Sequence, residues 1–164
     1  MNEIFHRTSI RRFTGEEVEA EKIELIMRAA MAAPSAANQQ PWEFVIVTNK
    51  AVLEQLSKTT PYASCLANAP LGIVVLIRRE CRIPEYAEID CSIACENIWL
   101  EADSLGLGCV WLGVAPVKER VAAVDAVLRT PSVFETFALL AIGYPAEERQ
   151  QQDRFDPKRI HYLR

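Results

Sequence analysis

Residues 34–42, PSAANQQPW, place two prolines around a stretch of small and amide side chains. Before it, apolar residues recur at i, i+3, i+4 and i+7 from Ile23, which predicts a helix over 19–32 that Pro34 brings to an end. After it, bulky residues alternate from Trp42 and predict a buried strand over 42–48. The link between helix and strand is thus poor in apolar surface yet rich in hydrogen-bonding groups, and it needs an explanation.

The other sequence patterns predict further strands and helices that are joined in varied ways. Asn2 is the expected N-cap of an opening helix, and Thr14 with Glu17 fits a capping box ahead of the helix over 19–32. This arrangement is typical of an α+β fold, or of an α/β fold with a mixed sheet. The remaining strands are expected over 72–78, 109–112 and 137–143, and the helices over 2–8, 50–58, 86–105 and 117–128.

The predicted helix over 86–105 carries two apolar stripes. One stripe runs from Ala87 to Leu105, and the other includes Ile89 and Ile93. A helix that is apolar on more than one side is buried on more than one side. In a chain of this size, we expect another subunit to cover the second stripe.

The composition is that of an ordinary globular protein. The chain has 164 residues, of which 50% are hydrophobic and 24% charged, with a formal net charge of −4. This length predicts one domain with a charged tail over 146–164, and the acidic balance argues against a nucleic-acid partner. The apolar run over 73–77 is far shorter than the roughly 20 residues of a membrane-spanning helix. We therefore expect no membrane partner and a cytoplasmic location.

Five cysteines occur in the chain, and no two of them have CxxC spacing. Cys91 and Cys95 lie i, i+4 on a predicted helix and could share a metal ion, with only His6 and His161 to complete the site. Buried free thiols are the interpretation that we favour. We therefore predict no metal site.

Residues 106–113, GLGCVWLG, match a dinucleotide-binding fingerprint only in part. The third glycine position holds Trp111, and the segment follows a helix instead of a strand. Gly106 fits a helix C-cap, whereas Gly113 follows a strand, where bare backbone can approach a ligand closely. The chain has no P-loop, no GxSxG elbow and no obvious catalytic pair of carboxylates. An enzyme with this sequence would therefore rely on a bound cofactor.

Residues 7–13, RTSIRRF, gather three arginines and two hydroxyl groups in an otherwise acidic chain. Guanidinium and hydroxyl groups are the donors that bind a phosphate monoester. A solvated basic surface run is the alternative. This segment alone does not decide between the two.

Taken in order, the motifs RTSIRRF, PSAANQQPWEFVIV, LGLGCVWLG, IGYPAEE and RFDPKRIHY resemble the short form of the FMN-dependent nitroreductase family over nearly the whole chain. The resemblance implies an α+β fold with a central, mostly antiparallel sheet flanked by helices. It also implies an obligate homodimer with an extensive helical interface and FMN in two clefts between the subunits. The chain, 1–164, would then be a single FMN-binding domain whose tail, about 146–164, packs on the dimer.

The same resemblance assigns residues to the cofactor. Arg7, Ser9 and Arg154 match the family's phosphate clamp, and Arg11 matches the cation at the N1–C2 edge of the flavin. The backbone N–H near Gly113 matches the donor to the flavin N5. Because the flavin performs the chemistry, no catalytic side chain is expected, and Arg11 and Gly113 only tune the ring. The other matched residues are Thr8, Leu112 and, in a loop that lies against the flavin of the neighbouring subunit, Pro34, Ser35, Ala36 and Asn38.

The activity implied by the resemblance is the NADH- or NADPH-dependent reduction of small acceptors such as nitroaromatics and quinones. The donor reduces FMN and leaves before the acceptor takes the electrons in a second step. The sequence does not distinguish NADH from NADPH. One alternative is a non-catalytic flavin carrier or flavin-dependent regulatory module, and another is a dimeric interaction protein with an empty cleft.

Overall fold

The computed structural model describes residues 3–164, so the predicted cap Asn2 lies outside the described residues. Strands and helices occur at the places that the sequence patterns predict, with small shifts at their ends. The helices are α1 (Glu3–His6), α2 (Ala20–Met31), α3 (Lys50–Leu56), α4 (Ala87–Ser104) and α5 (Lys118–Leu128). The strands are β1 (Trp42–Val47), β2 (Leu71–Arg78), β3 (Gly108–Gly113) and β4 (Phe134–Gly143).

The strands form one sheet in the order β1-β2-β4-β3, and each neighbouring pair is antiparallel. Register places Val45, Val74, Leu139 and Leu112 in one row across the sheet. Side chains alternate between the two faces of a strand, so the adjacent row belongs to the other face. The prediction of an α+β fold with a mostly antiparallel central sheet is confirmed, and the alternative of a mixed sheet is wrong.

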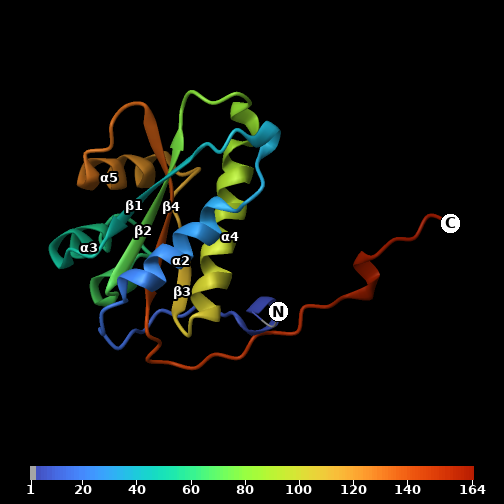
Figure 1. Cartoon of the computed structure of the whole chain (residues 1–164), viewed down its shortest axis with the longest axis horizontal. Coiled ribbons are helices and arrows are strands. Elements are labelled where there is room, and N and C mark those ends of the chain that lie inside the picture. Colours follow the sequence, from blue (N-terminus) through green and yellow to red (C-terminus); the bar gives the residue numbers. More distant parts are fainter. Residues whose placement is uncertain (1–2) are drawn as a thin grey trace.

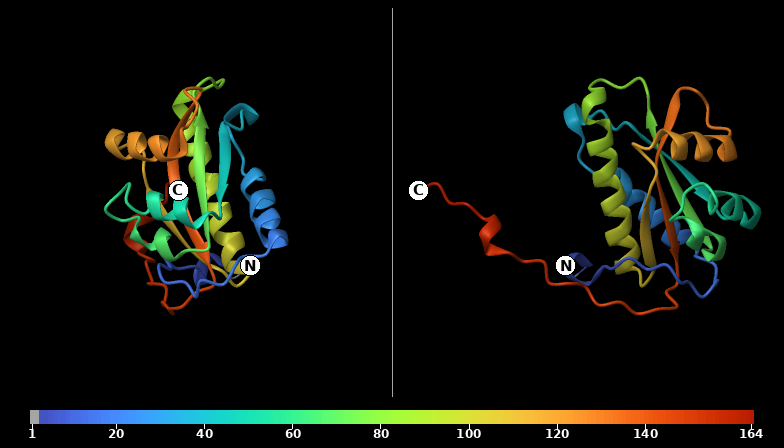
Figure 2. Two further views of the ribbon diagram at one scale, coloured as in Figure 1. Left: turned by 90° about the vertical axis from the view of Figure 1, so that its left-hand side faces the viewer. Right: turned by 180° about the vertical axis from the view of Figure 1, so that it is seen from behind.

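Helices cover both faces of the sheet, as Figures 1 and 2 show. On one face, Leu53 of α3 and Val124 of α5 join a buried cluster with Val74 and Leu139. On the other face, α2 and α4 form a second buried cluster with the sheet, which includes Ile26 and Ile98. The two-sided covering explains why residues 73–77 of β2 and 137–142 of β4 are continuous apolar runs without polar alternation.

Helix α4 is buried along one side and accessible along part of the other. Cys91, Ala94 and Ile98 of the first apolar stripe are fully buried against the sheet and α2. Ile89 of the second stripe is 54% exposed, and Ile93 is only partly buried. The protomer alone therefore does not cover this stripe, and the expected partner subunit stays a prediction.

The ends of α4 and α2 test the two capping predictions. Gly106 has a φ of +76°, Leu107 N–H donates to the Ala102 carbonyl at 2.8 Å, and Gly106 N–H donates to the Asp103 carbonyl at 3.0 Å. This is a Schellman motif, so the predicted C-cap at Gly106 is confirmed. The predicted capping box at Thr14 is wrong, because Thr14 Oγ1 accepts from Glu16 N–H in a local turn and α2 begins only at Ala20.

The segment over 7–13 lies along the sheet edge formed by β3. Ser9 pairs with Cys109 in a parallel bridge, and Ile10 N–H donates to the Cys109 carbonyl at 3.0 Å. Ile10 packs directly on Gly108, where an added Cβ would lie 2.6 Å from its Cγ2. Only glycine permits this close approach. The extended segment consequently buries Ile10 and directs its polar neighbours to the other side.

The tail divides into two parts. Residues 146–152 run back along the protomer, where Ala146 N–H donates to the Arg12 carbonyl and Gln151 Nε2 donates to the Ile4 and Arg7 carbonyls. Beyond them the chain extends away from the body, as Figure 1 shows. Phe155 and Tyr162 are 74% and 73% exposed. The packing of this outer part on a dimer stays a prediction.

Candidate functional site

Arginines from both ends of the chain surround one small polar cavity of about 210 Å³. We call its cationic and hydroxyl residues, Arg7, Ser9, Arg11, Arg149 and Arg154, the anion cradle. None of the described residues that line the cavity is acidic. The structure therefore brings together the residues predicted to bind phosphate, including Arg154, and it adds Arg149, which the sequence reasoning missed. The remaining lining residues are Thr8, Gln150, Gln151 and Gln152.

Arg7 is the most buried cation of the cradle. Its guanidinium lies 4.2 Å over the Trp99 ring, and its side chain is only 17% exposed. Its Nε is buried and has no hydrogen-bond partner among the described residues, although the Glu96 carboxylate lies 3.5 Å away. A buried N–H without an acceptor is costly. The guanidinium of Arg7 is thus held between the Trp99 ring and the Glu96 carboxylate at the wall of the cavity.

Glu147 orders the cradle from its rim. Its Oε1 accepts from the backbone N–H groups of Arg11 at 2.6 Å and Arg12 at 3.1 Å. Its Oε2 accepts from Nε and Nη2 of Arg149, both at 3.1 Å. The hydrogen bond from the backbone N–H of Arg11 is the main reason why the pKa of Glu147 lies below its usual value. The sequence reasoning missed this residue, because only the fold brings the first tail residues to the 7–13 segment.

A second cavity of about 380 Å³, which we call the ring cavity, adjoins the cradle and shares Arg11 with it. Its walls are more apolar and include Tyr62, Trp111, Leu112 and Gly113. An added Cβ at Gly113 would meet no atom within 4 Å, so the backbone there is open to a ligand. The predicted site residues Leu112 and Gly113 thus lie beside the cradle, at the end of β3.

Two residues at the ring cavity have no signal in the sequence. Arg120 Nη1 donates to the Gly113 carbonyl at 3.2 Å, and its guanidinium lies 5.3 Å over the ring of the wall residue Tyr62. Arg120 belongs to α5 and Tyr62 to the loop after α3. They come together only because both elements cover the same face of the sheet.

Residues 34–40, which we call the signature loop, lie elsewhere on the protomer. Ala36 N–H donates to Asp90 on the first turn of α4 at 2.9 Å. The cradle segment lies against the other half of α4, where Trp99 Nε1 donates to the Thr8 carbonyl. Nine residues of helix separate Asp90 from Trp99, which corresponds to about 14 Å. The predicted residues Pro34, Ser35, Ala36 and Asn38 line neither cavity, so one protomer does not unite the two groups.

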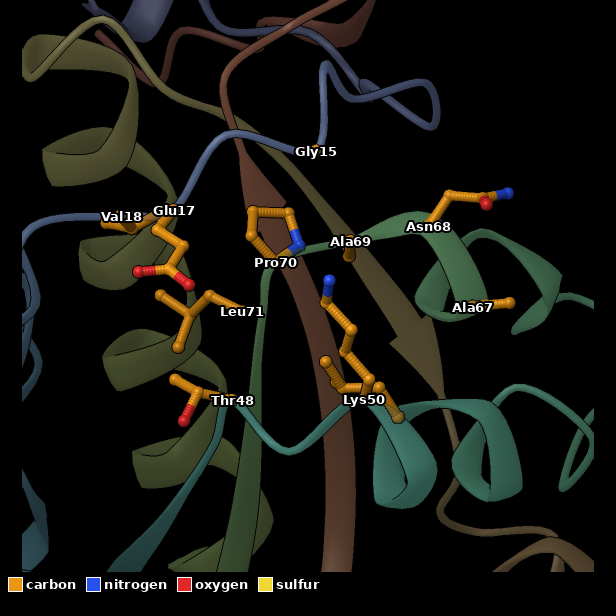
Figure 3. Close-up of a pocket in the computed structure, with 11 residues that line it drawn as sticks. Gly15, Glu17, Val18, Thr48, Lys50, Ala67, Asn68, Ala69, Pro70 and Leu71 are labelled. Atoms are coloured by element: carbon orange, nitrogen blue, oxygen red, sulfur yellow. The ribbon is translucent and has the colours of Figure 1, made fainter.

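A larger cavity of about 480 Å³ lies away from these residues and is shown in Figure 3. It is bounded by Gly15, Thr48 and the turn before β2, and Lys50 points toward Pro70. Its two charged side chains, Glu17 and Lys50, are solvent-exposed. No residue that the sequence singles out for ligand binding lies here, and we place the functional site at the cradle instead.

The nitroreductase family profile matches residues 4–60 and 56–144 of the chain. The chain belongs to the nitroreductase family. It is 42% identical over 156 residues to a protein of Methanothermobacter thermautotrophicus provisionally named NADH dehydrogenase/NAD(P)H nitroreductase, an alignment that covers 94% of this chain and 82% of that protein. The predicted family resemblance is therefore confirmed.

Solved structures of relatives share the fold of this nitroreductase-family chain. A provisionally named NADH oxidase from Clostridium acetobutylicum is 45% identical with a TM-score of 0.95, and the match covers 99% of each chain. An FMN-dependent nitroreductase from Clostridium difficile is 32% identical with a TM-score of 0.92, and the match covers 99% of this chain and 98% of that one.

The thiols of this family member line neither the cradle nor the ring cavity. Cys65, Cys91, Cys95 and Cys109 are buried and free, and burial raises the pKa of the Cys91 thiol to about 12. Within residues 3–164, no group of three or more His, Cys, Asp and Glu side chains could hold a metal ion. No helix in the same range has the length and apolar character needed to cross a membrane.

Proposed function

We propose that this nitroreductase-family protein is a single FMN-binding domain that passes electrons from NADH or NADPH to small acceptors such as nitroaromatics and quinones. The observation that supports the proposal is the position of Arg11, which lines both the cationic cradle and the ring cavity with its aromatic walls. A molecule with a phosphate at one end and a flat polar ring at the other fits this pair of cavities. The cytoplasmic location expected from the sequence belongs to the same proposal.

The residues present fit FMN in charge as well as in shape. A phosphate monoester carries nearly two negative charges at neutral pH. Arg7, Arg149 and Arg154 would hold it with charge-assisted hydrogen bonds, and Ser9 would add a neutral one. The name of the Clostridium difficile relative, an FMN-dependent nitroreductase, supports the same cofactor.

The ring cavity explains how the chain can work without a catalytic side chain. FMN, when bound, would supply the hydride and electron transfer. Arg11 would place a positive charge at the ring edge that becomes more negative on reduction, and the open backbone at Gly113 would offer a hydrogen-bond donor. Tyr62 and Trp111 would limit access of water to the ring. The nicotinamide donor and the acceptor would use the remaining open face in turn.

We further propose that the site is completed by a second copy of the chain. The signature loop lies about 14 Å along α4 from the cradle, and the second apolar stripe of α4 is exposed at Ile89. Two copies packed through α4 in opposite directions would bring the loop of each to the ring cavity of the other. The exposed outer tail, with Phe155 and Tyr162, would lie on the partner.

The first test is a visible absorption spectrum of the purified protein, recorded without oxygen before and after NADH or NADPH is added. We expect a flavin spectrum that bleaches with at least one donor. A flavin spectrum that neither donor bleaches would favour the carrier or regulatory module. A colourless protein that takes up no added FMN would refute the proposed cofactor.

Arg11→Ala tests the placement of this cation at the ring. Loss of a neighbouring positive charge destabilises the reduced ring more than the oxidised ring. We therefore expect weaker FMN binding and a lower flavin reduction potential, measured by fluorescence titration and by equilibration with a reference dye. The exposed neighbour Arg12 is the matched control, since Arg12→Ala removes the same charge without touching either cavity. Equal potentials in the Arg11 variant and the wild type would contradict the placement.

A further inference from the structure

The signature loop has a backbone that most side chains avoid. Ala37, Asn38 and Gln40 have φ values of 48°, 53° and 46°, in the left-handed region that disfavours residues with a Cβ. None of the three side chains is buried, so packing within the protomer does not compensate for the strain. Clustered strain of this kind persists only when surrounding contacts enforce it, and it is typical of functional sites.

A buried carboxylate enforces this conformation from below. Asp90 is only 2% exposed, an unusual environment for an acidic side chain. Its Oδ1 accepts from Ala36 N–H at 2.9 Å, and its Oδ2 accepts from Gln39 Nε2 at 2.7 Å. Both oxygens thus bind the signature loop, at its beginning and near its end.

Gln39 is the second anchor, and its amide is directed toward α4. Its Nε2 also donates to the Ile83 carbonyl at 3.0 Å, while its Oε1 accepts from Ile83 N–H at 2.8 Å. The single amide side chain therefore joins the loop to Asp90 and to the segment that leads into α4. Ser35 closes the loop itself, because its Oγ accepts from Gln40 N–H at 3.0 Å.

The combination of anchoring hydrogen bonds and backbone strain indicates what the loop is for. The anchored residues fix a surface of small groups, at Ala36 and Ala37, beside the amide of Asn38. Neither the anion cradle nor the ring cavity includes that surface, and its small groups allow close approach of a flat ring. We infer that Asp90 and Gln39 are positioning residues that hold the signature loop in the shape that contacts the flavin ring bound by a second copy, an inference that rests on the proposed FMN site.

The test compares Asp90→Asn, Gln39→Glu and the double variant with the wild type. Asp90→Asn places an NH₂ group opposite one of two donors, the Ala36 N–H or the Gln39 side-chain NH₂. Gln39→Glu places the new carboxylate against that of Asp90. In the double variant, the amide introduced at position 90 would accept from Ala36 N–H and donate to the carboxylate introduced at position 39, so one hydrogen bond is restored with its polarity reversed. Glu88→Gln is the matched control, since Glu88 is exposed in the same helical turn and its side chain has no hydrogen bond among the described residues.

FMN affinity is measured by fluorescence titration, and inorganic phosphate is used as a competitor to report on the cradle alone. We expect each single variant to bind FMN about tenfold more weakly, the factor for one hydrogen bond to a charged group. The affinity for phosphate should be unchanged, and the double variant should recover part of the FMN affinity. Visible circular dichroism of bound FMN should change in the single variants and return toward the wild-type signal in the double variant.

The outcomes separate this inference from the proposed function. Wild-type protein that binds no FMN would refute the proposed function and with it the inference. Wild-type protein that binds FMN, with single variants of equal affinity or with equal losses in Glu88→Gln, would refute the positioning role alone. If Asp90→Asn fails to fold in a thermal melt, Gln39→Glu and its rescue by the double variant still decide the question.

Discussion

The anion cradle and the signature loop are both polar surfaces, but they are built in opposite ways. The cradle presents guanidinium groups to the ligand side, and the carboxylate of Glu147 only orders its rim. The loop presents small and neutral groups, and the carboxylate that anchors it, Asp90 of α4, is buried beneath it. The cradle would therefore bind a ligand mainly through its positive charge, whereas the loop would contact a ligand mainly through its fixed backbone shape.

The difference also concerns how much of the fold each surface requires. The loop and its anchors come from residues 35–40, Ile83 and the first turn of α4. The cradle joins the first residues of the chain to the tail across the edge of β3, through Glu147 and Gln151. A phosphate-bearing ring needs both surfaces in the proposed site, and one protomer holds them at separate places along α4.

Arg7→Ala tests whether the cradle dominates the binding of the cofactor. Loss of the most buried guanidinium should weaken FMN binding about a hundredfold, because charge-assisted hydrogen bonds to phosphate are lost. Riboflavin, which lacks the phosphate, should bind the variant and the wild type equally in fluorescence titrations. Arg7→Lys keeps the positive charge but lacks the two-pronged guanidinium, so its FMN affinity should lie between those of Arg7→Ala and the wild type. Equal losses for FMN and riboflavin would show that Arg7 does not bind the phosphate.

Removal of residues 155–164 tests the outer tail separately from the cradle, because Arg154 is retained. If the exposed Phe155 and Tyr162 lie on a partner, their loss should raise the dimer dissociation constant at least about tenfold. Sedimentation velocity over a range of concentrations measures this change. Arg154→Ala in the full-length chain should instead weaken FMN binding and leave the dimer intact. An unchanged dissociation constant in the shortened chain would place the tail in solvent.

Glu147→Gln tests how the cradle is ordered. The variant should bind FMN about threefold more weakly at neutral pH, because a neutral oxygen is a poorer acceptor for the Arg11 amide. The folded-state pKa of Glu147 is lowered, so its contribution to stability is present above about pH 4.5 and is lost as pH falls through the folded pKa. Thermal melts should thus show that the variant loses less stability than the wild type below pH 4.5. If the melting temperatures of the variant and the wild type fall equally below pH 4.5, this role is contradicted.

Gly113→Ala has the smallest expected effect and reports on the ring cavity. Because the added Cβ meets no atom within 4 Å, the melting temperature without ligand should not change. FMN affinity should fall about twofold, the cost of a small displacement of the ring. Differential scanning calorimetry and fluorescence titration measure the two quantities. A lower melting temperature without FMN would show that the glycine serves the fold instead of the ligand.

Sequence patterns predicted the local parts of this site well. Gly106 ends α4 as expected, and Trp42, in the strand predicted to be buried, lies in the core. The capping box at Thr14 failed because the N–H of Thr14 itself donates to the carbonyl of Tyr144, just after β4, a contact that no local pattern reveals. Glu147 was missed for the same reason.

The sequence by itself determined the strands, the helices and the family, because hydrophobic periodicity and short motifs act over a few residues. It also identified residues that the fold gathers around one cavity, namely Arg7, Ser9, Arg11 and Arg154. Only the tertiary structure decided that Glu147 and Arg149 order this cavity and that Asp90 and Gln39 hold the signature loop. The physical reason is that the hydrogen bonds of Glu147 to Arg11 and of Asp90 to the loop join residues tens of positions apart, so they exist only once the sheet and α4 have brought the segments together.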